Sequence, residues 1–255
     1  RVLWCFCAGA PRRRWHRCRH SSAHDYSLTK PLPLSLMDDF GRTLNIHVAG
    51  CAESHQKLLQ TLESLTDEQC REPSALPGWT RGHVLSHLAR NAESHVHVLQ
   101  CAARGEVGEQ YVGGAKARKQ GIETHAADSA ESLVASVRKS IYALEGQWAA
   151  TNSEGWQGRG VNSAGASIAM SDIVFLRWRE VEVHHADLAL AFTFANWNST
   201  YVRYELDRQV MMWRASKPMG LTPVPKIALQ LSPNERLAWF LGRTEVEGLP
   251  KVPGY

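Results

Sequence analysis

The stretch that decides the fold is residues 179–188, Arg-Glu-Val-Glu-Val-His-His-Ala-Asp-Leu. Its pattern predicts a helix in which Glu180 and His184, four residues apart, lie on the same face, one turn above the other. Upstream, Ile173 and Leu176 mark that face as apolar. A carboxylate and an imidazole that point into a helical core are costly unless something compensates their charge. A divalent metal ion would do so.

The third ligand of such a metal is expected from a neighbouring helix. Apolar residues at three- and four-residue steps predict a helix that begins after Thr80, a typical N-cap, and ends near Arg104. This helix carries His83, His87 and His95. We favour His87, because it borders the apolar row and lies deeper than His83. Two imidazoles, one carboxylate and an open position are a common set for a catalytic zinc ion.

Two alternatives stay open at this point. The ligands could instead be His83 and His87, an i, i+4 pair, together with His184. Without any metal, Glu180 and His184 could belong to a buried polar network in which Asp187 orients an imidazole. A single histidine beside a core is more often hydrogen-bonded to a neighbour than bound to a metal.

The rest of the chain favours a mainly helical fold. Long amphipathic patterns cover residues 40–65, 80–104, 129–150, and a segment from 167 or 171 to 191. We expect a polar, Gly-rich connection over 105–127, and a small hairpin or an ordered loop over 155–165. Four such helices with short and medium connections predict an antiparallel-type four-helix bundle.

Beyond the bundle we expect a smaller C-terminal region of helices and one strand. A helix is predicted over 199–215, ended by Lys217-Pro218-Met219-Gly220. The alternation over 226–231 is typical of a short strand, and 233–242 predicts a short helix. The predicted domains are a basic leader over 1–36, the bundle over 37–192 and a helical or α+β region over 193–255.

Charge is concentrated at the start of the chain. The 255 residues carry a formal net charge of +4, but residues 1–36 hold seven basic residues and one acid, which leaves −2 for the remainder. The body therefore gives no reason to expect a nucleic-acid partner. The leader is either an Arg-rich transit peptide or translated sequence upstream of a start at Met37, which the absence of an initial Met favours. We expect it to be disordered or not native.

The cysteines and the hydropathy bear on the compartment. Of the six cysteines, Cys51, Cys70 and Cys101 of the body show no paired spacing, which is typical of free thiols in a reducing compartment, and we expect them to be small core residues. The longest apolar run stays below the 18 or so residues of a membrane span. These observations favour a cytoplasmic protein, or a mitochondrial one if residues 1–36 are a genuine transit peptide.

Two strings resemble a known family. They are residues 76–91, Leu-Pro-Gly-Trp-Thr-Arg-Gly-His-Val-Leu-Ser-His-Leu-Ala-Arg-Asn, and residues 177–188, Arg-Trp-Arg-Glu-Val-Glu-Val-His-His-Ala-Asp-Leu. Both are similar to the mycothiol-dependent maleylpyruvate isomerase family. The resemblance runs from about Met37 to the end of the sequence and includes residues 213–220 and 236–243. It implies a DinB-like four-helix bundle whose metal ligands are His87, Glu180 and His184. The C-terminal region is short for that family.

The resemblance also implies a reaction. Zinc or another divalent metal, with mycothiol or another low-molecular-weight thiol, would catalyse cis–trans isomerisation of a small unsaturated keto acid by thiol addition and elimination, or S-transfer to an electrophile. A carboxylate substrate needs a cationic clamp, for which Arg243 and, second, Arg177 are candidates. His185 and Asp187 are candidates for orienting the ligands. The alternatives are a metal-dependent hydrolase that activates water and a non-enzymatic helical stress or binding protein.

Overall fold

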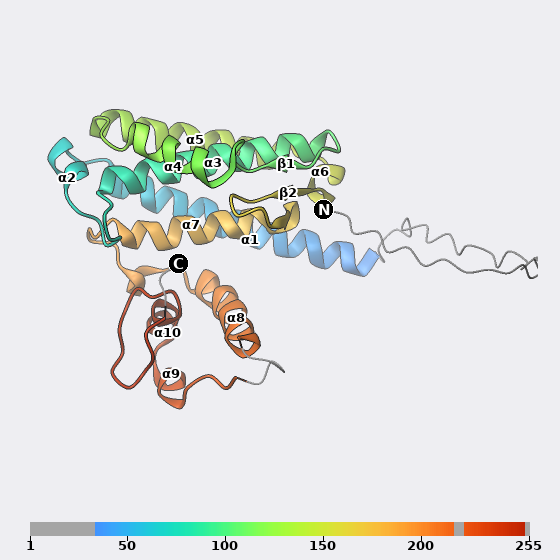
Figure 1. The fold of residues 1–255 in the computed structure, drawn as a ribbon. Helices are drawn as coiled ribbons and strands as arrows, with labels where there is room; N and C mark the ends of the chain where they lie inside the picture. The colour runs from blue at the N-terminus through green and yellow to red at the C-terminus, as the bar shows by residue number, and fades with distance from the viewer. Residues whose placement is uncertain (1–33, 217–221, 253–255) are drawn as a thin grey trace, which may run out of the picture.

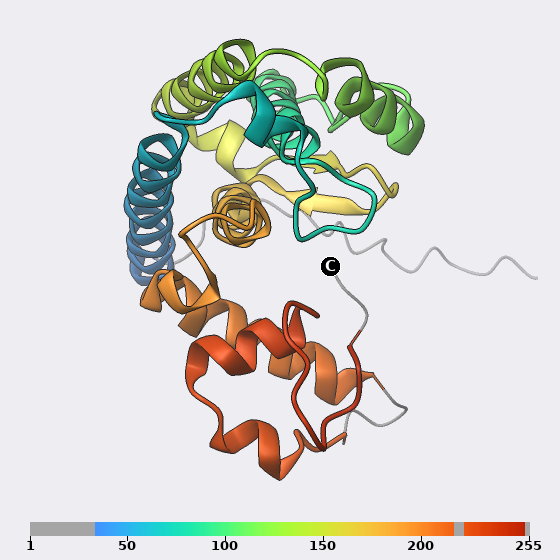
Figure 2. The ribbon, with the colours of Figure 1, turned by 90° about the vertical axis from the view of Figure 1, so that its left-hand side faces the viewer.

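Four long helices form the body of the molecule in this computed structural model, which describes residues 34–216 and 222–252. They are α1 (Leu34–Leu62), α3 (Arg81–Ala103), α5 (Ala130–Ala150) and α7 (Ile173–Asp187). Helix α3 packs against α5 and α7, and α1 packs against the same two helices. The arrangement is the predicted four-helix bundle (Figures 1 and 2).

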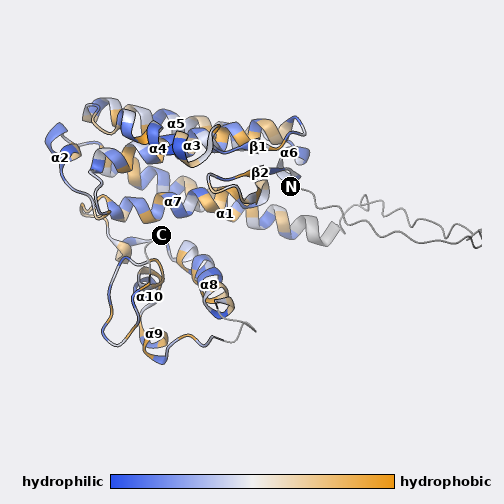
Figure 3. Cartoon of the chain, in the orientation of Figure 1, coloured by the Kyte–Doolittle hydropathy of each residue, from blue (hydrophilic) through white to orange (hydrophobic). Residues whose placement is uncertain are grey.

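The core consists of the apolar rows that the sequence predicted. Val84, Leu88 and Ala92 of α3 are buried, and so is the α5 row from Leu133 to Trp148. Each long helix carries both hydrophilic and hydrophobic residues along its length, as amphipathic helices do (Figure 3). Burial of each Val or Leu side chain contributes about 1.5–3 kcal/mol, so these rows hold the helices together.

The ends of the helices follow local capping chemistry. The hydroxyl of Thr80 accepts a hydrogen bond from the amide of His83, and Ser129 accepts one from Ser132 at the start of α5. Helix α7 begins at Ile173, after a 3₁₀ turn, rather than at Ser167 or Ser171. It ends at Asp187, before the predicted residue 191, because Ala189 has a left-handed backbone with φ of 52°.

The prediction that residues 105–127 form only a polar, Gly-rich connection is wrong. It contains strand β1 (Gly108–Glu109) and helix α4 (Gly114–His125), which packs against α3. The hairpin expected nearby is confirmed as β2 (Arg159–Val161) paired antiparallel with β3 (Ser167–Ala169), and β1 adds to β2 in parallel. A Cβ on Gly108 would lie 2.7 Å from the Sγ of Cys101, so only glycine lets this sheet approach α3 so closely.

Further helices and 3₁₀ turns lie between and after these elements in the described residues. They are α2 (Asp67–Arg71), α6 (Ser153–Gln157), α8 (Ser199–Ala215), α9 (Lys226–Gln230), α10 (Pro233–Phe240) and the 3₁₀ turns η1 (Met170–Asp172) and η2 (Phe194–Asn196). The strand predicted over 226–231 is wrong, since these residues form α9. Five residues with a buried Ala228 between exposed Ile227 and Leu229 fit one helical turn as well as a strand.

Some predictions fall outside the described residues. The leader does so except for its last three residues, which begin α1, and so does the segment 217–220. The division into a bundle and a C-terminal region at residue 193 stays a prediction. None of the helices in 34–216 and 222–252 combines the length and the apolar character that a membrane span requires.

Candidate functional site

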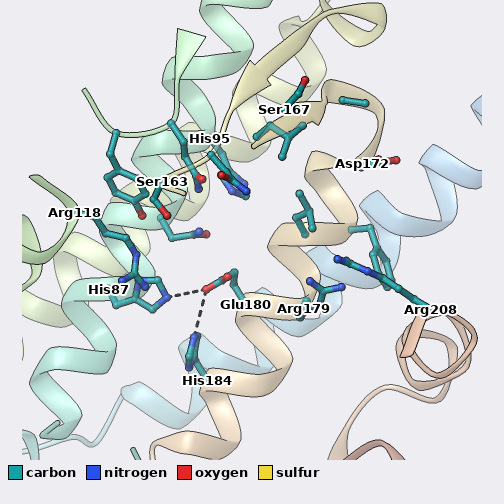
Figure 4. Close-up of a pocket in the computed structure, with 18 of the residues that line it drawn as sticks. His87, His95, Arg118, Ser163, Ser167, Asp172, Arg179, Glu180, His184 and Arg208 are labelled. Carbon is teal, nitrogen blue, oxygen red and sulfur yellow. Dashed lines mark hydrogen bonds and ion pairs between the residues drawn. The ribbon is translucent and has the colours of Figure 1, made fainter. Parts of the chain in front are cut away.

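Helices α3 and α7 bring together the three residues predicted as metal ligands. Glu180 and His184 lie one turn apart on α7, and His87 faces them from α3 (Figure 4). The Oε2 of Glu180 is 2.7 Å from the Nε2 of His87 and 3.4 Å from the Nε2 of His184. One ligand atom from each of the three lies within 4.8 Å of the others. This is the spacing that a single metal ion needs, and metal binding itself stays a prediction.

The electrostatics of the trio keep Glu180 ionised. Burial by itself would raise the pKa of Glu180, but its hydrogen bonds to His184 and His87 outweigh this and hold the pKa well below its ordinary value. Burial lowers the pKa of His87 to about 4 despite the bond to Glu180. For His184, burial acts in the same direction, but bonds to Asp187 and Glu180 raise its pKa. Glu180 and the neutral His87 can thus donate to a metal ion as they stand, and His184 would release its proton on binding one.

A second carboxylate holds His184 in place. Asp187 Oδ2 lies 2.8 Å from His184 Nδ1, so the imidazole turns its Nε2 toward Glu180. Asp187 is in turn bound by Arg243, whose Nε and Nη2 each donate to it at 2.8 Å. A carboxylate behind a histidine fixes both the ring orientation and the tautomer of a metal ligand. Of the two orienting candidates, Asp187 therefore has the fitting geometry.

The other histidines have separate roles. His185 is directed away from the trio: its Nε2 lies 2.8 Å from the hydroxyl of Thr61, and its ring stacks on Phe192 at 3.7 Å. His83 completes the cap of α3 with Thr80 and lies 3.4 Å from Glu123. The alternative ligand set with His83 is therefore not assembled. His95, two turns above His87 on α3, lines the cavity next to the trio.

The trio opens into a cavity of about 1430 Å³. Its walls come from the loop before α3, α3, the segment between β1 and α4, α4, the β2–β3 hairpin, α7 and α8, with His47 of α1. Figure 4 shows Glu180 and His184 on one side and His87, His95, Arg118 and Ser163 on the other. A bound molecule could therefore reach the trio while contacting several elements at once.

Neither Arg177 nor Arg243, the arginines predicted to bind a substrate carboxylate, lines this cavity. Arg177 is fully buried and donates to His55, to the carbonyl of Leu88 and to Asn91. Arg243 is engaged with Asp187. The arginines in the cavity wall are Arg118, Arg159, Arg179 and Arg208.

Of these, Arg118 contacts the trio: its Nη2 is 3.4 Å from the Nδ1 of His87. Arg118 was not predicted as a site residue from the sequence, because it lies in α4, within a segment that was expected to be a polar connection. Arg208 lies on α8, outside the bundle motifs. Only the folded chain places both in the wall of one cavity.

The cysteines of the body are buried and free, as expected. Cys51, Cys70 and Cys101 pack in the interior, and none lines the cavity. Burial raises the pKa of the Cys51 thiol, which disfavours a thiolate there. Within residues 34–216 and 222–252, therefore, no cysteine offers a thiol to the trio.

The fold and the site define a class: a four-helix bundle with a His–Glu–His trio in the wall of a large cavity. The chain belongs to the mycothiol maleylpyruvate isomerase N-terminal domain family, whose model matches residues 51–189. That match spans α3 and α7 and so contains all three members of the trio.

Solved structures agree on the fold. The crystal structure of the mycothiol-dependent maleylpyruvate isomerase is 20% identical, covers 83% of this chain and 97% of its own, and has a TM-score of 0.73. A mutant of that enzyme gives a TM-score of 0.72 over the same shares. A comparison with curated proteins finds no match. At this identity the structures establish the shared fold.

Proposed function

We propose that this chain is a metal-dependent enzyme that uses a low-molecular-weight thiol, of which mycothiol is the first candidate. It would isomerise a small unsaturated keto acid from cis to trans, or transfer the thiol to another electrophile. The observation that carries the proposal is the convergence of His87, Glu180 and His184 in the wall of a cavity large enough for two small molecules. The family supports the choice of reaction.

The three residues fit a divalent metal such as zinc. Their donor atoms are two imidazole Nε2 atoms and one carboxylate oxygen, a set common in catalytic zinc sites, and their spacing suits one ion. The burial of both histidines and the brace from Asp187 hold the donors in place before any ion binds. When bound, a metal with an open position favours the deprotonated form of a thiol.

The isomerisation consumes only the substrate, because the thiol is regenerated. A thiolate adds to the cis carbon–carbon double bond, whose remaining single bond can rotate. Elimination of the same thiolate restores the double bond in the trans form, so the thiol is returned unchanged. Protein groups must hold the substrate carboxylates and stabilise negative charge as it develops. Arg118 is the cation best placed for this, because it lies beside His87 in the cavity wall.

Metal content and thiol-dependent turnover test the proposal. Purified protein should hold about one divalent ion per chain, and His87→Ala and His184→Ala should each lose it. His97→Ala on the same helix is the matched control, since His97 lies outside the trio and contacts Cys101 instead. The assay supplies maleylpyruvate with mycothiol, and separately with glutathione, and follows fumarylpyruvate.

The outcomes of these measurements distinguish the three candidate functions. Thiol-dependent conversion that disappears in both trio variants supports the proposal. A metal-loaded protein that hydrolyses substrates without any thiol would indicate that the trio activates water instead. Wild-type protein that holds no divalent ion after metal-supplemented purification would leave the helical binding protein as the better description.

A further inference from the structure

The trio takes its donors from two helices, so its geometry depends on how those helices are held together. His87 lies on α3, whereas Glu180 and His184 lie on α7 (Figure 4). A shift of either helix would move His87 relative to the other two donors. A working metal site needs its ligands held to within about 0.5 Å. The contacts that fix α3 against α7 on both sides of the trio therefore decide how well it can hold an ion.

Arg177 fixes the two helices on one side of the trio. It belongs to α7 and precedes Glu180 by three residues. Its Nη1 donates at 2.8 Å to the backbone carbonyl of Leu88 and at 2.9 Å to Oδ1 of Asn91. Leu88 directly follows His87 on α3. The guanidinium of Arg177 therefore ties α7 to the turn of α3 that carries a metal ligand.

Arg81 fixes the helices on the other side of the trio, and it does so in the opposite direction. It is the first residue of α3, and its Nε donates at 2.6 Å to the carbonyl of Leu188, four residues after His184. Its Nη2 donates at 3.3 Å to the carbonyl of Ala189. The start of α3 thus meets the end of α7. Each helix sends one arginine to backbone carbonyls at the other, and the trio lies between the two ties.

The backbone that Arg81 holds is strained. Ala189 has a φ of 52° and is the one residue other than glycine with a left-handed backbone in the described part of the chain. Such a conformation persists only where the surrounding contacts determine it, which is frequent near functional sites. The bonds from Arg81 to Leu188 and Ala189 are contacts of this kind. They fix the point at which α7 ends, just beyond His184.

Stability alone does not explain the choice of an arginine at position 177. The side chain of Arg177 is fully buried, and burial lowers its pKa. Among the described residues, its hydrogen bonds go to an imidazole, a carbonyl and an amide, and not to a carboxylate. Buried charges often stabilise a fold no better than apolar side chains of similar volume. A planar fork with several donors does supply a defined geometry.

The two remaining helices of the bundle hold that fork in place. The Nε of Arg177 donates at 3.1 Å to Nε2 of His55 on α1. Because a guanidinium can only donate, Nε2 is the acceptor and Nδ1 of His55 carries the proton. Nδ1 donates it to Glu145 on α5 at 2.8 Å. The network therefore includes all four long helices and directs Nη1 of Arg177 toward α3.

We propose that Arg177 and Arg81 are positioning residues that fix the spacing of α3 and α7 from the two sides of the trio and so set the geometry in which it binds a metal ion. The inference rests on the proposed function, in which the trio holds that ion. The hydrogen bonds described above go to neighbours of the three ligands, so both arginines act through the helices.

Three matched arginine-to-methionine variants test the proposal. Arg177→Met and Arg81→Met each remove one tie between α3 and α7. Arg90→Met is the control, because Arg90 also lies on α3 but donates at 2.8 Å to Ser136 of α5, outside the cavity wall. Competition with a chelator of known affinity measures zinc binding. The affinity should fall about 10-fold in the first two variants, the lower end for loss of support around metal ligands, and stay unchanged in the control.

Cobalt substitution reports the geometry itself. The visible absorption of bound Co²⁺ depends on the number and arrangement of its ligands, so reduced stability by itself leaves the spectrum of the folded protein unchanged. The spectra of Arg177→Met and Arg81→Met should differ from that of wild type, and the spectrum of Arg90→Met should match it. Circular dichroism checks folding. If Arg177→Met does not fold, Arg81→Met decides the question, because Arg81 is 8% exposed and not fully buried.

The outcomes separate this inference from the proposed function. Wild-type zinc affinity and cobalt spectrum in Arg81→Met and in folded Arg177→Met would overturn the positioning role. An equal loss of affinity in Arg90→Met would overturn it too, because any loosened contact of α3 would then have the same effect. In both cases wild type still holds its ion, so the proposed function stands. Wild-type protein that binds neither zinc nor cobalt would overturn both.

Discussion

Glu180 occupies the point at which the two helices of the site meet. A single oxygen, Oε2, contacts the Nε2 atoms of both His87 and His184. Because the pKa of His184 is raised and that of Glu180 is lowered, a proton on His184 offsets the buried negative charge when no metal is bound. A divalent ion would take over this compensation. The carboxylate–imidazole pair, costly by itself, is thus satisfied in either state.

Asp187 should matter for metal affinity as well as for stability, to which its buried ion pair with Arg243 contributes. Asp187→Asn keeps the side-chain size but removes the charge that accepts from His184 Nδ1, so we expect zinc affinity to fall about 10- to 100-fold. Asp128→Asn is a closely matched control. Asp128 forms an i, i+3 pair with His125 at 2.9 Å, but on an exposed helix end. Competition with a chromogenic chelator measures both affinities. An unchanged affinity in Asp187→Asn would contradict an orienting role.

At the residue scale the sequence could predict the trio but not its surroundings. The four-residue step between Glu180 and His184 is a local signal, and the helical face of His87 is another. The groups opposite them, Arg118 and Tyr111, come from a segment whose polar and Gly-rich composition shows no periodicity. Their place in the cavity depends on how β1 and α4 pack on α3, which is a long-range property.

At the element scale, the contact between α1 and α7 depends on one glycine. A Cβ on Gly50 would lie 2.2 Å from the ring of Trp178, which is fully buried on α7. Gly50→Ala must therefore push the two helices apart or tilt the indole away from its partner Ser54. Overpacking of this kind costs about 1–3 kcal/mol.

Gly146→Ala is expected to have the opposite effect on the stability of the fold. Gly146 lies inside α5 with nothing within 4 Å of an added Cβ, so alanine there should stabilise the fold by about 0.5–1 kcal/mol. Urea denaturation of both variants beside wild type measures the difference. Equal stabilities of Gly50→Ala and Gly146→Ala would show that α1 and α7 are not closely packed at Trp178.

The sequence predicts elements best where several signals coincide. Helices α3 and α5 combine a long apolar row with a Thr or Ser cap, and both begin within a residue of the prediction. Helix α4 has neither signal, since its N-cap is Gly113 and of its residues only Ile122 is buried. Helix α9 is too short for its period to distinguish it from a strand. Packing against neighbouring elements decided both cases.

For the whole molecule, buried histidines should make stability depend on pH. Burial lowers the pKa of four of them, to about 4 for His55, His87 and His185 and to about 3 for His95. In the unfolded chain they would titrate near pH 6.5. Between pH 6.5 and 4 the unfolded state therefore binds more protons, so the free energy of unfolding falls as the pH falls.

His184 acts in the opposite direction. Its raised pKa contributes stability that is fully present below pH 6.5 and is lost as the pH rises through its folded value. Four lowered values outweigh one raised value, and each net proton is worth about 1.4 kcal/mol per pH unit. We expect metal-free protein to lose at least about 2 kcal/mol between pH 7 and pH 5. Urea denaturation with a chelator present measures this, and a constant or rising stability toward pH 5 would contradict it.

The bond between Arg243 and Asp187 also has a consequence for the order in which the site is completed during synthesis. Arg243 follows Asp187 by 56 residues, so the bundle helices and their three donor atoms leave the ribosome well before it does. Until α10 has formed and carried Arg243 back to α7, Asp187 lacks the partner that holds it against His184. A nascent chain would therefore hold the three donors less firmly than the finished protein does, and an ion bound by the trio would be held firmly only after the C-terminal helices dock.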